Sequence, residues 1–172
     1  MYDSVAVVIP ALDRNRYYSE GDLVRFGDTT LLEWKISQVL EVVNRENIYI
    51  STPSDKILGL VRDYGLNGVK RAQETDQNKW ISESVEPVEK ENILWTYVTA
   101  PFISSGDYRC MLKTFFGLPE KYDSLISVYK EQEYILYKET PLNFNIDQYK
   151  IRKEIEPVYR ITNGCYITPK EN

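Results

Sequence analysis

The sequence predicts an α/β fold in which a mainly parallel sheet carries a small β-rich appendage. Three observations lead to this fold class: apolar runs without alternation, amphipathic helical segments between these runs, and a change near residue 124 to short alternating segments. Strands that alternate with helices form a parallel sheet with helical crossovers. We therefore expect a single domain over residues 1–172, with the appendage at about 124–160.

Four segments have the composition of strands in such a sheet. They are rich in β-branched and other apolar residues and are bounded by polar or turn-forming residues. In chain order they are residues 5–9, 47–52, 68–71 and 92–99. The last of these, NILWTYVT, is the clearest candidate for a central strand.

Three segments combine a helical apolar period with capping residues. They are residues 30–43, the segment from Ser54 to Gly65, and residues 104–117. Thr30 and Glu33 have the spacing of a capping box at the start of the first segment. Ser104 and Asp107 have the same spacing at the start of the third. The polar residues 72–91 are expected to be the least ordered part of the chain.

The last third of the chain changes to a β-rich pattern. Residues 124–130 and 133–138 alternate like the two strands of a hairpin. Residues 141–146 and 163–168 add short extended pieces.

The composition excludes several classes of protein. A net charge of −5 argues against a general nucleic-acid binder, whose surface would be basic. The absence of histidine excludes His-based triads, His general bases and His metal ligands. No apolar run approaches the roughly 18 residues of a membrane span, and no basic region precedes the N-terminal apolar stretch, so we expect a cytoplasmic protein without membrane contacts. Cys110 and Cys165 form no CxxC pair and are expected to be reduced, buried thiols.

The candidate binding site follows from the expected topology. In open parallel sheets, ligands bind at the carboxyl ends of the strands, where the strand order switches. The loops after Ile9, Thr52 and Thr99 open at this edge. The first loop, ALDRNRYYSEGD, lies where an α/β enzyme usually has a phosphate-binding turn, yet it contains a single glycine, Gly21.

Several segments resemble the cytidylyltransferases that activate acidic sugars, above all the CMP-acylneuraminate synthetases. IPALDRNRYYSEGDLVRFGDTTLLEW is similar to the family's IPAR strand, phosphate-binding loop and GGKPL turn. ISTPSDKILGLVRDYG resembles VSTDDEEIAEIAREYG, YVTAPF resembles QPTSPL, and PVYRITNGCYIT resembles YRxNGAIYI. The segments occur in the family's order and cover nearly the whole chain. The resemblance implies a Rossmann-like three-layer nucleotidyltransferase fold and a homodimer formed through the appendage.

The resemblance also implies a reaction and the residues that serve it. Family enzymes transfer CMP from CTP to an acidic sugar and release pyrophosphate, with Mg²⁺ and the protein positioning the groups and neutralising charge. The residues that match nucleotide contacts are Ala11, Leu12, Arg14, Asn15, Arg16, Gly21, Arg71 and Thr99. The residues that match sugar contacts are Tyr97, Arg160, Asn163 and Gly164. For Arg71 and Arg160, a structural ion pair is the alternative to a ligand contact.

The phosphate-binding loop departs from the family pattern. Leu12 stands where the family has an arginine, and Gly21 stands where it has a lysine. Asp13 replaces a glycine and would repel a triphosphate. Arg14 and Arg16 either compensate for the lost cations, since arginine binds phosphate well, or lie on a solvated loop.

Family enzymes hold Mg²⁺ with an aspartate pair near the C-terminus, and no such pair occurs within these 172 residues. Either the natural chain continues past Asn172 with this segment, or the protein lacks these ligands. Two functions therefore stay open: a cytidylyltransferase, or a non-catalytic relative that acts as a binding or assembly module on the same fold.

Overall fold

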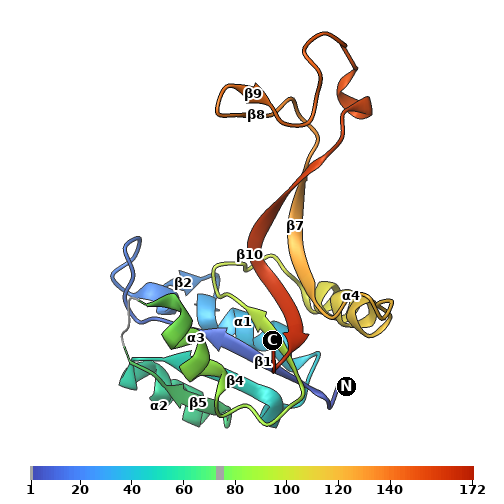
Figure 1. The fold of residues 1–172 in the computed structure, drawn as a ribbon. Helices are drawn as coiled ribbons and strands as arrows, with labels where there is room; N and C mark the ends of the chain where they lie inside the picture. Colours follow the sequence, from blue (N-terminus) through green and yellow to red (C-terminus); the bar gives the residue numbers. More distant parts are fainter. Residues whose placement is uncertain (1, 73–75) are drawn as a thin grey trace. The chain divides into compact units, whose positions relative to one another are not determined.

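The computed structural model describes residues 2–72 and 76–172, and the chain divides into two compact units. The larger unit comprises Met1–Leu125 and Asn163–Asn172, and the smaller unit comprises Ile126–Thr162 (Figure 1). Within the described part of the chain, every helix is too short or too polar to cross a bilayer.

A mainly parallel sheet forms the centre of the larger unit (Figure 1). Its strands are β1 (Val5–Pro10), β4 (Ile48–Thr52), β5 (Asn67–Lys70), β6 (Asn92–Thr96) and the last part of β10 (Val158–Pro169). Their order is β5-β4-β1-β6-β10. Parallel pairs join β1 to β4, β1 to β6, and β4 to β5, whereas β10 is antiparallel to β6.

Helices cover both faces of this sheet, which gives the predicted Rossmann-like three-layer arrangement. The helices are α1 (Leu31–Leu40), α2 (Asp55–Asp63), α3 (Gln77–Val85) and α4 (Ser105–Phe116). In β1, Val5, Val7 and Ile9 pack with α1, α2 and α4, whereas Ala6 and Val8 pack with α3. Because alternate residues face opposite layers, the strand is apolar throughout.

Two capping boxes begin α1 and α4, as the sequence predicts. The Thr30 side chain accepts the backbone N–H of Glu33, and the Glu33 carboxylate accepts the backbone N–H of Thr30. Ser104 and Asp107 make the reciprocal bonds at α4. The prediction that the first helix extends to residue 43 is wrong, because α1 ends at Leu40 and the next residues form a turn that donates back to Val39.

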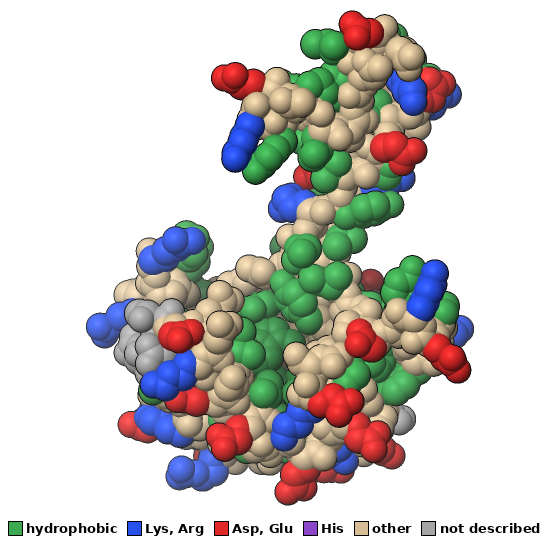
Figure 2. Space-filling view, in the orientation of Figure 1, with side chains coloured by type: hydrophobic (Ala, Val, Ile, Leu, Met, Phe, Trp, Pro, Cys, Tyr) green, Lys and Arg blue, Asp and Glu red, His purple; other side chains and the backbone are tan. Residues whose placement is uncertain are grey.

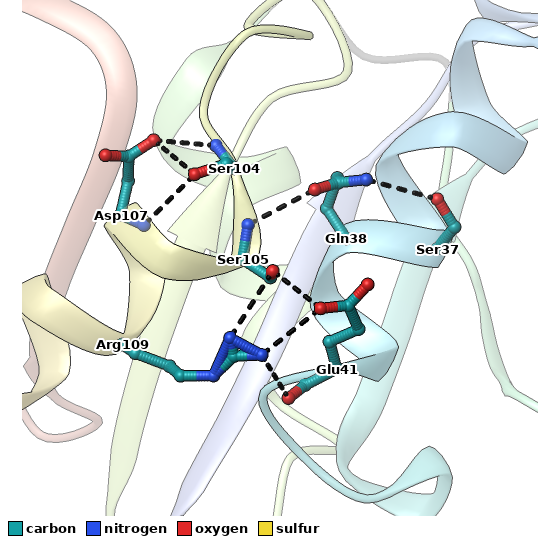
Figure 3. Close-up of polar contacts among 7 residues, drawn as sticks. All are labelled: Ser37, Gln38, Glu41, Ser104, Ser105, Asp107 and Arg109. Carbon is teal, nitrogen blue, oxygen red and sulfur yellow. Dashed lines mark hydrogen bonds and ion pairs between the residues drawn. The ribbon is translucent and has the colours of Figure 1, made fainter.

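A polar network joins α1 to the N-terminal turn of α4 (Figure 3). The Ser105 hydroxyl donates to the Glu41 carboxylate at 2.7 Å, and the Ser105 backbone N–H donates to the Gln38 side chain at 3.2 Å. Arg109 adds an ion pair to Glu41 at 3.2 Å. These contacts fix the start of α4 and therefore the end of the loop that connects it to β6.

Within residues 72–91, the structure contains a helix that the polar composition of this segment does not predict. Gln77–Val85 form α3, which begins at Asp76, whose side chain accepts the backbone N–H groups of Asn78 and Lys79. Trp80, Ile81 and Val85 pack against the sheet. Their helical spacing provides an apolar face that the polar majority of the segment obscures. Residues 73–75 of this segment lie outside the described residues.

The expected hairpin in the smaller unit is also wrong. β7 (Leu125–Glu131) pairs with β10, and the hydroxyl groups of Ser127 and Thr162 lie 2.9 Å apart across this pair. A separate small hairpin joins β8 (Leu136–Tyr137) to β9 (Thr140–Pro141). Its turn residues Lys138 and Glu139 both have positive φ, 47° and 66°. Hairpin turns with two positive φ values usually contain Asn or Gly, so the sequence lacks the usual signal.

The two cysteines differ in exposure. Cys165 on β10 is buried, as expected, whereas Cys110 on α4 is exposed, which corrects the expectation of a buried thiol. The buried residues of α4 include Tyr108 and Leu112. Cys110 lies halfway between them in sequence, and the helical period turns it to the opposite side.

Candidate functional site

A pocket of about 480 Å³ lies at the carboxyl end of β1 and β6 in the larger unit. Its walls come from the first loop, the residue after β5, the first turn of α3, and the segment after β6. The lining residues are Pro10, Ala11, Leu12, Asn15, Arg16, Tyr17, Asp22, Arg71, Trp80, Tyr97, Val98 and Thr99. This edge of the sheet is where parallel folds bind ligands.

The first loop is closed by reciprocal hydrogen bonds between its two ends. The Asp22 carboxylate accepts the backbone N–H of Leu12 at 2.7 Å, and the Asp22 N–H donates to the Leu12 carbonyl at 2.7 Å. Asp22 is 8% exposed, and its burial raises the pKa of the carboxyl, while the bond from Leu12 opposes this shift. A buried carboxylate therefore forms part of the pocket wall.

Gly21 makes this closure possible. Its φ is +55°, and a Cβ atom at this position would lie 2.2 Å from the Leu12 carbonyl oxygen and 2.5 Å from the Arg14 nitrogen. Both the left-handed backbone and the close approach of the loop require glycine. The single glycine of the loop thus closes the loop on itself.

Asn15 orders the middle of the loop. Its side-chain oxygen accepts the backbone N–H groups of Tyr17 at 2.9 Å and Tyr18 at 3.0 Å. Its own N–H donates to the Tyr18 carbonyl at 3.2 Å. These are the bonds of an Asx turn, and they use backbone donors that a phosphate-binding loop would present to its ligand.

The charged side chains of the first loop have different surroundings. Arg16 lines the pocket, and its guanidinium lies over the Tyr17 ring, 4.6 Å from the centroid. Arg14 is exposed and is absent from the described lining. Asp13 accepts a hydrogen bond from the Ser54 hydroxyl at the start of α2 and is also absent from that lining. Of the two arginines considered as substitutes for the family's cations, only Arg16 borders the described pocket.

Arg71 is the buried cation of the pocket. It follows β5, is 8% exposed, and lies with its guanidinium carbon 4.9 Å from the centroid of the Trp80 ring. Its Nη1 donates to the Ala72 carbonyl at 3.2 Å, and its Nε has no hydrogen-bond partner among the described residues. Burial lowers the pKa of Arg71, and the nearby Glu83 carboxylate opposes this shift.

The opposite wall carries Tyr97 and Thr99. Tyr97 belongs to a row of aromatic rings on one face of the sheet, with centroids 6.1 Å from Trp95 and 6.4 Å from Tyr166. Burial raises the pKa of Tyr97. The row continues from Trp95 to Trp80 at 5.5 Å, so the ring that stacks on Arg71 is joined to the ring of Tyr97 by continuous aromatic contact.

Lys35 supports this wall from the core, and the sequence analysis did not identify it. The residue is fully buried on α1, and its Nζ donates to the Ala100 carbonyl and to the Tyr108 hydroxyl, both at 2.7 Å. Burial lowers the pKa of Lys35 to about 8. A signal was present, because Lys35 lies three residues after Leu32 on the apolar face of the predicted helix.

The network continues from Lys35 to β10. The Tyr108 and Thr96 hydroxyl groups lie 2.7 Å apart, and the Thr96 hydroxyl donates to the Gly164 carbonyl at 2.7 Å. Gly164 is therefore tied to the support of the site. Neither Gly164 nor Asn163 lines the described pocket.

Arg160, the remaining residue expected to bind the sugar, belongs to the smaller unit. Its Nε forms an ion pair with Glu131 at 3.2 Å, and its guanidinium lies 5.3 Å from the centroid of the Tyr129 ring. Within this unit, the contacts of Arg160 are therefore those of a structural ion pair, the alternative that the sequence left open.

The described lining of the pocket offers few ligands to a protein-held magnesium ion. Nucleotide sites usually hold Mg²⁺ through one or two carboxylates together with phosphate oxygens. Among the described residues, no cluster of three acidic or other ligating side chains occurs, and Asp22 is the one carboxylate in the described lining. One oxygen of Asp22 is already engaged by Leu12.

Comparison with known proteins finds relatives by structure rather than by sequence. No family model and no curated protein matches the sequence. The 4-diphosphocytidyl-2C-methyl-D-erythritol synthase from Anaerococcus prevotii aligns with a TM-score of 0.68 at 17% identity, over 98% of this chain and 72% of that one. A cytidylyltransferase from Leptospira borgpetersenii aligns at 0.66 and 15% identity, over 99% and 62%. CMP:2-keto-3-deoxy-manno-octonic acid synthetase, in a complex with CTP, aligns at 0.69 and 14% identity, over 97% and 74%.

Identities this low establish the fold rather than the activity or the particular family. The chain spans between 62% and 74% of the length of these three proteins. The names of all three proteins refer to cytidine nucleotides, and each alignment covers nearly the whole of this chain. The chain therefore has the Rossmann-like nucleotidyltransferase fold that these cytidylyltransferases share.

Proposed function

We propose that the pocket of the larger unit is a cytidine-nucleotide site, and that the reaction it serves is transfer of CMP from CTP to an acidic sugar. The observation that carries the nucleotide site is the buried guanidinium of Arg71. A buried cation with an unused donor is costly unless a ligand supplies an acceptor. Carbonyl oxygens of a pyrimidine and phosphate oxygens are such acceptors, and guanidinium binds both well.

In the proposed reaction, an oxygen of the sugar attacks the α-phosphorus of CTP. A new P–O bond forms, the bond from the α-phosphorus to the bridging oxygen of the β-phosphate breaks, pyrophosphate leaves with the electron pair, and the proton of the sugar hydroxyl passes to solvent. Arg16 and Arg71 neutralise charge on the nucleotide, and Tyr97 and Thr99 form the wall against which it is oriented. Among the described residues, no cluster of three ligating side chains occurs, so these roles are assigned without a metal ligand.

The second candidate is a non-catalytic module that binds a nucleotide or assembles with a partner. A specific observation favours it: the first loop places the carboxylate of Asp22 in the pocket, and Leu12 offers no cation. A carboxylate near the transferred phosphoryl group opposes the charge stabilisation on which this chemistry depends.

Nucleotide binding is tested by thermal unfolding with CMP, CTP, UTP, ATP and GTP. A ligand at about 100 times its Kd stabilises the fold by about 2.7 kcal/mol, which raises Tm by several degrees. Arg71→Met is expected to abolish the shift. Arg62→Met removes an exposed arginine on α2 and is the matched control that keeps it. No shift with any nucleotide would overturn the proposed site.

Pyrophosphate release then separates the two candidates. The assay uses CTP and Mg²⁺ with a set of sugar acids, and turnover that Arg71→Met removes supports the transferase. Nucleotide binding without pyrophosphate release from any sugar acid supports the non-catalytic module.

We also propose a homodimer formed through the smaller unit. All of its residues are described, and Ile155 is the only hydrophobic residue among them that is buried. Leu136, Ile146 and Tyr149 are 61%, 78% and 85% exposed. Figure 2 shows hydrophobic side chains spread over the surface of this unit. Apolar exposure on this scale is typical of a surface that packs against another chain.

Light scattering after size exclusion tests the dimer. The wild-type protein is expected to have twice the mass of one chain in solution. The Ile146→Asp variant is expected to have the mass of a single chain. A monomeric wild-type protein at micromolar concentration would contradict this proposal without affecting the nucleotide site.

A further inference from the structure

The part of the pocket that would receive a phosphate already contains an anion. Asp22 is 8% exposed, lines the pocket, and accepts the Leu12 backbone N–H at 2.7 Å. Backbone N–H groups in the turn after a strand are the donors that α/β nucleotide sites direct at phosphates. Asp22 thus engages, from within the chain, a donor that a phosphate oxygen would otherwise accept.

Other donors of the loop are engaged in the same way. Asn15 accepts the backbone N–H groups of Tyr17 and Tyr18, and the Gly21 N–H donates to the Tyr18 carbonyl at 3.1 Å. The loop is therefore held in shape by its own side chains and carbonyl groups. An incoming phosphate gains few new hydrogen bonds from this backbone.

The charge of the lining is small. The charged side chains in the described lining are Arg16, Arg71 and Asp22, whose formal charges sum to +1. Glu83 lies near Arg71 and reduces its field further. A phosphate monoester carries about −1.5 to −2 at neutral pH, and a triphosphate carries roughly twice this charge. Repulsion from Asp22 grows with ligand charge, so it acts most strongly on the triphosphate.

We infer that Asp22 makes this site selective for a nucleoside monophosphate over a nucleoside triphosphate. The carboxylate engages the Leu12 N–H and repels each additional phosphoryl group, while Arg71 and Arg16 together suffice for one phosphoryl group. This inference rests on the proposed nucleotide site and names the ligand class for it.

The test is calorimetric titration of CMP and of CTP, without added metal, into three proteins. Asp22→Asn keeps a side-chain oxygen to accept the Leu12 N–H and removes only the charge. Asp13→Asn makes the same charge change in the same loop, at a carboxylate bonded to Ser54 and absent from the described lining, and is the matched control.

The wild-type protein is expected to bind CMP at least about tenfold more tightly than CTP. Asp22→Asn is expected to raise the affinity for CTP at least about tenfold and to change the affinity for CMP by less than about threefold. Asp13→Asn is expected to keep the wild-type ratio within about threefold. The wild-type ratio needs no substitution, so the selectivity is measured even if Asp22→Asn does not fold.

Two results would overturn the inference alone: equal affinity of the wild-type protein for CMP and CTP, or the same change in ratio from both substitutions. The second would mean that net charge, rather than the position of Asp22, sets the selectivity. No binding of either nucleotide to any of the three proteins would instead overturn the nucleotide site itself.

Discussion

Lys35 offers the sharpest test of how the core supports the pocket. Burial lowers the pKa of this side chain from its usual 10.5 to about 8 in the folded protein. The unfolded chain therefore binds more protons than the folded chain between about pH 8 and pH 10.5. Linkage requires the folded state to become more stable as pH rises through this window, because the cost of burying the charge disappears when the amine loses its proton.

The size of the effect follows from the two pKa values. A folded pKa of about 8 against 10.5 unfolded gives a gain of about 1.4 kcal/mol between pH 7 and pH 9, and about 3 kcal/mol when titration is complete. Lys35→Met keeps the side-chain volume and removes the titrating group. At pH 7, loss of the Lys35 hydrogen bonds lowers the free energy of unfolding, whereas removal of the buried charge raises it. The stability of Lys35→Met at a single pH is therefore not diagnostic.

Urea unfolding of both proteins at pH 7, 8 and 9 measures the difference. Between pH 7 and pH 9, the free energy of unfolding of the wild-type protein is expected to rise by about 1.4 kcal/mol relative to that of Lys35→Met. Burial also raises the pKa of Cys165 to about 12 and raises the pKa of Tyr108, which favours unfolding at high pH, while the Lys35 charge opposes the shift of Cys165. Both groups stay protonated in the folded state up to pH 9 with or without Lys35, so their contributions to the free energy of unfolding cancel between the two proteins. Lys113→Met, on the exposed side of α4, is expected to parallel the wild-type profile. Parallel profiles for wild type and Lys35→Met would refute a buried, charged Lys35.

Two other predictions follow from backbone geometry and exposure. Gly21→Ala is expected to lower the free energy of unfolding by about 3 kcal/mol or more, because it combines a φ of +55° with a contact 2.2 Å from Leu12. Gly27→Ala, with a φ of +60° and open space around it, is expected to cost about 1 kcal/mol, and equal costs in urea unfolding would contradict the steric argument. With a thiol reagent, Cys110 is expected to react in the native state and Cys165 only after unfolding. Rapid reaction of both thiols in the native protein would contradict the buried position of Cys165.

Much of the fold was predictable because local signals and burial agree. β1 is apolar throughout, since both of its faces are covered, and the capping residues Thr30 and Ser104 begin α1 and α4 as expected. α3 was missed because its apolar side chains are a minority within a polar segment. The pairing in the smaller unit was missed because β7 pairs with β10, far along the chain, while a local hairpin forms at a turn without Asn or Gly.

The position of the pocket was predictable from topology, but the contacts within it were not. Parallel strands place the first loop and Tyr97 at one edge of the sheet, and the pocket includes both. The bond from Leu12 to Asp22 spans ten residues, and the bond from Lys35 to Ala100 spans 65. Neither contact has a local signature, because each depends on the tertiary path of the backbone. Comparison of this sequence with the family motif therefore shows which side chains of the motif are missing. It does not show which side chains take their place in the folded protein.

The replacements change where binding energy arises in this pocket. The hydrogen bonds of Asn15, Gly21 and Asp22 order the loop before any ligand arrives, which lowers the entropic cost of binding. The same bonds leave few donors for a phosphate, which lowers the gain. The lower entropic cost benefits every ligand, whereas the smaller number of free donors weakens only those contacts that a ligand makes to the loop. In the proposed site, affinity must then come mainly from groups other than the loop backbone, and the buried guanidinium of Arg71, whose Nε has no hydrogen-bond partner among the described residues, is the strongest of these. The selectivity proposed for Asp22 and the affinity proposed for Arg71 therefore arise from different residues and can be tested separately.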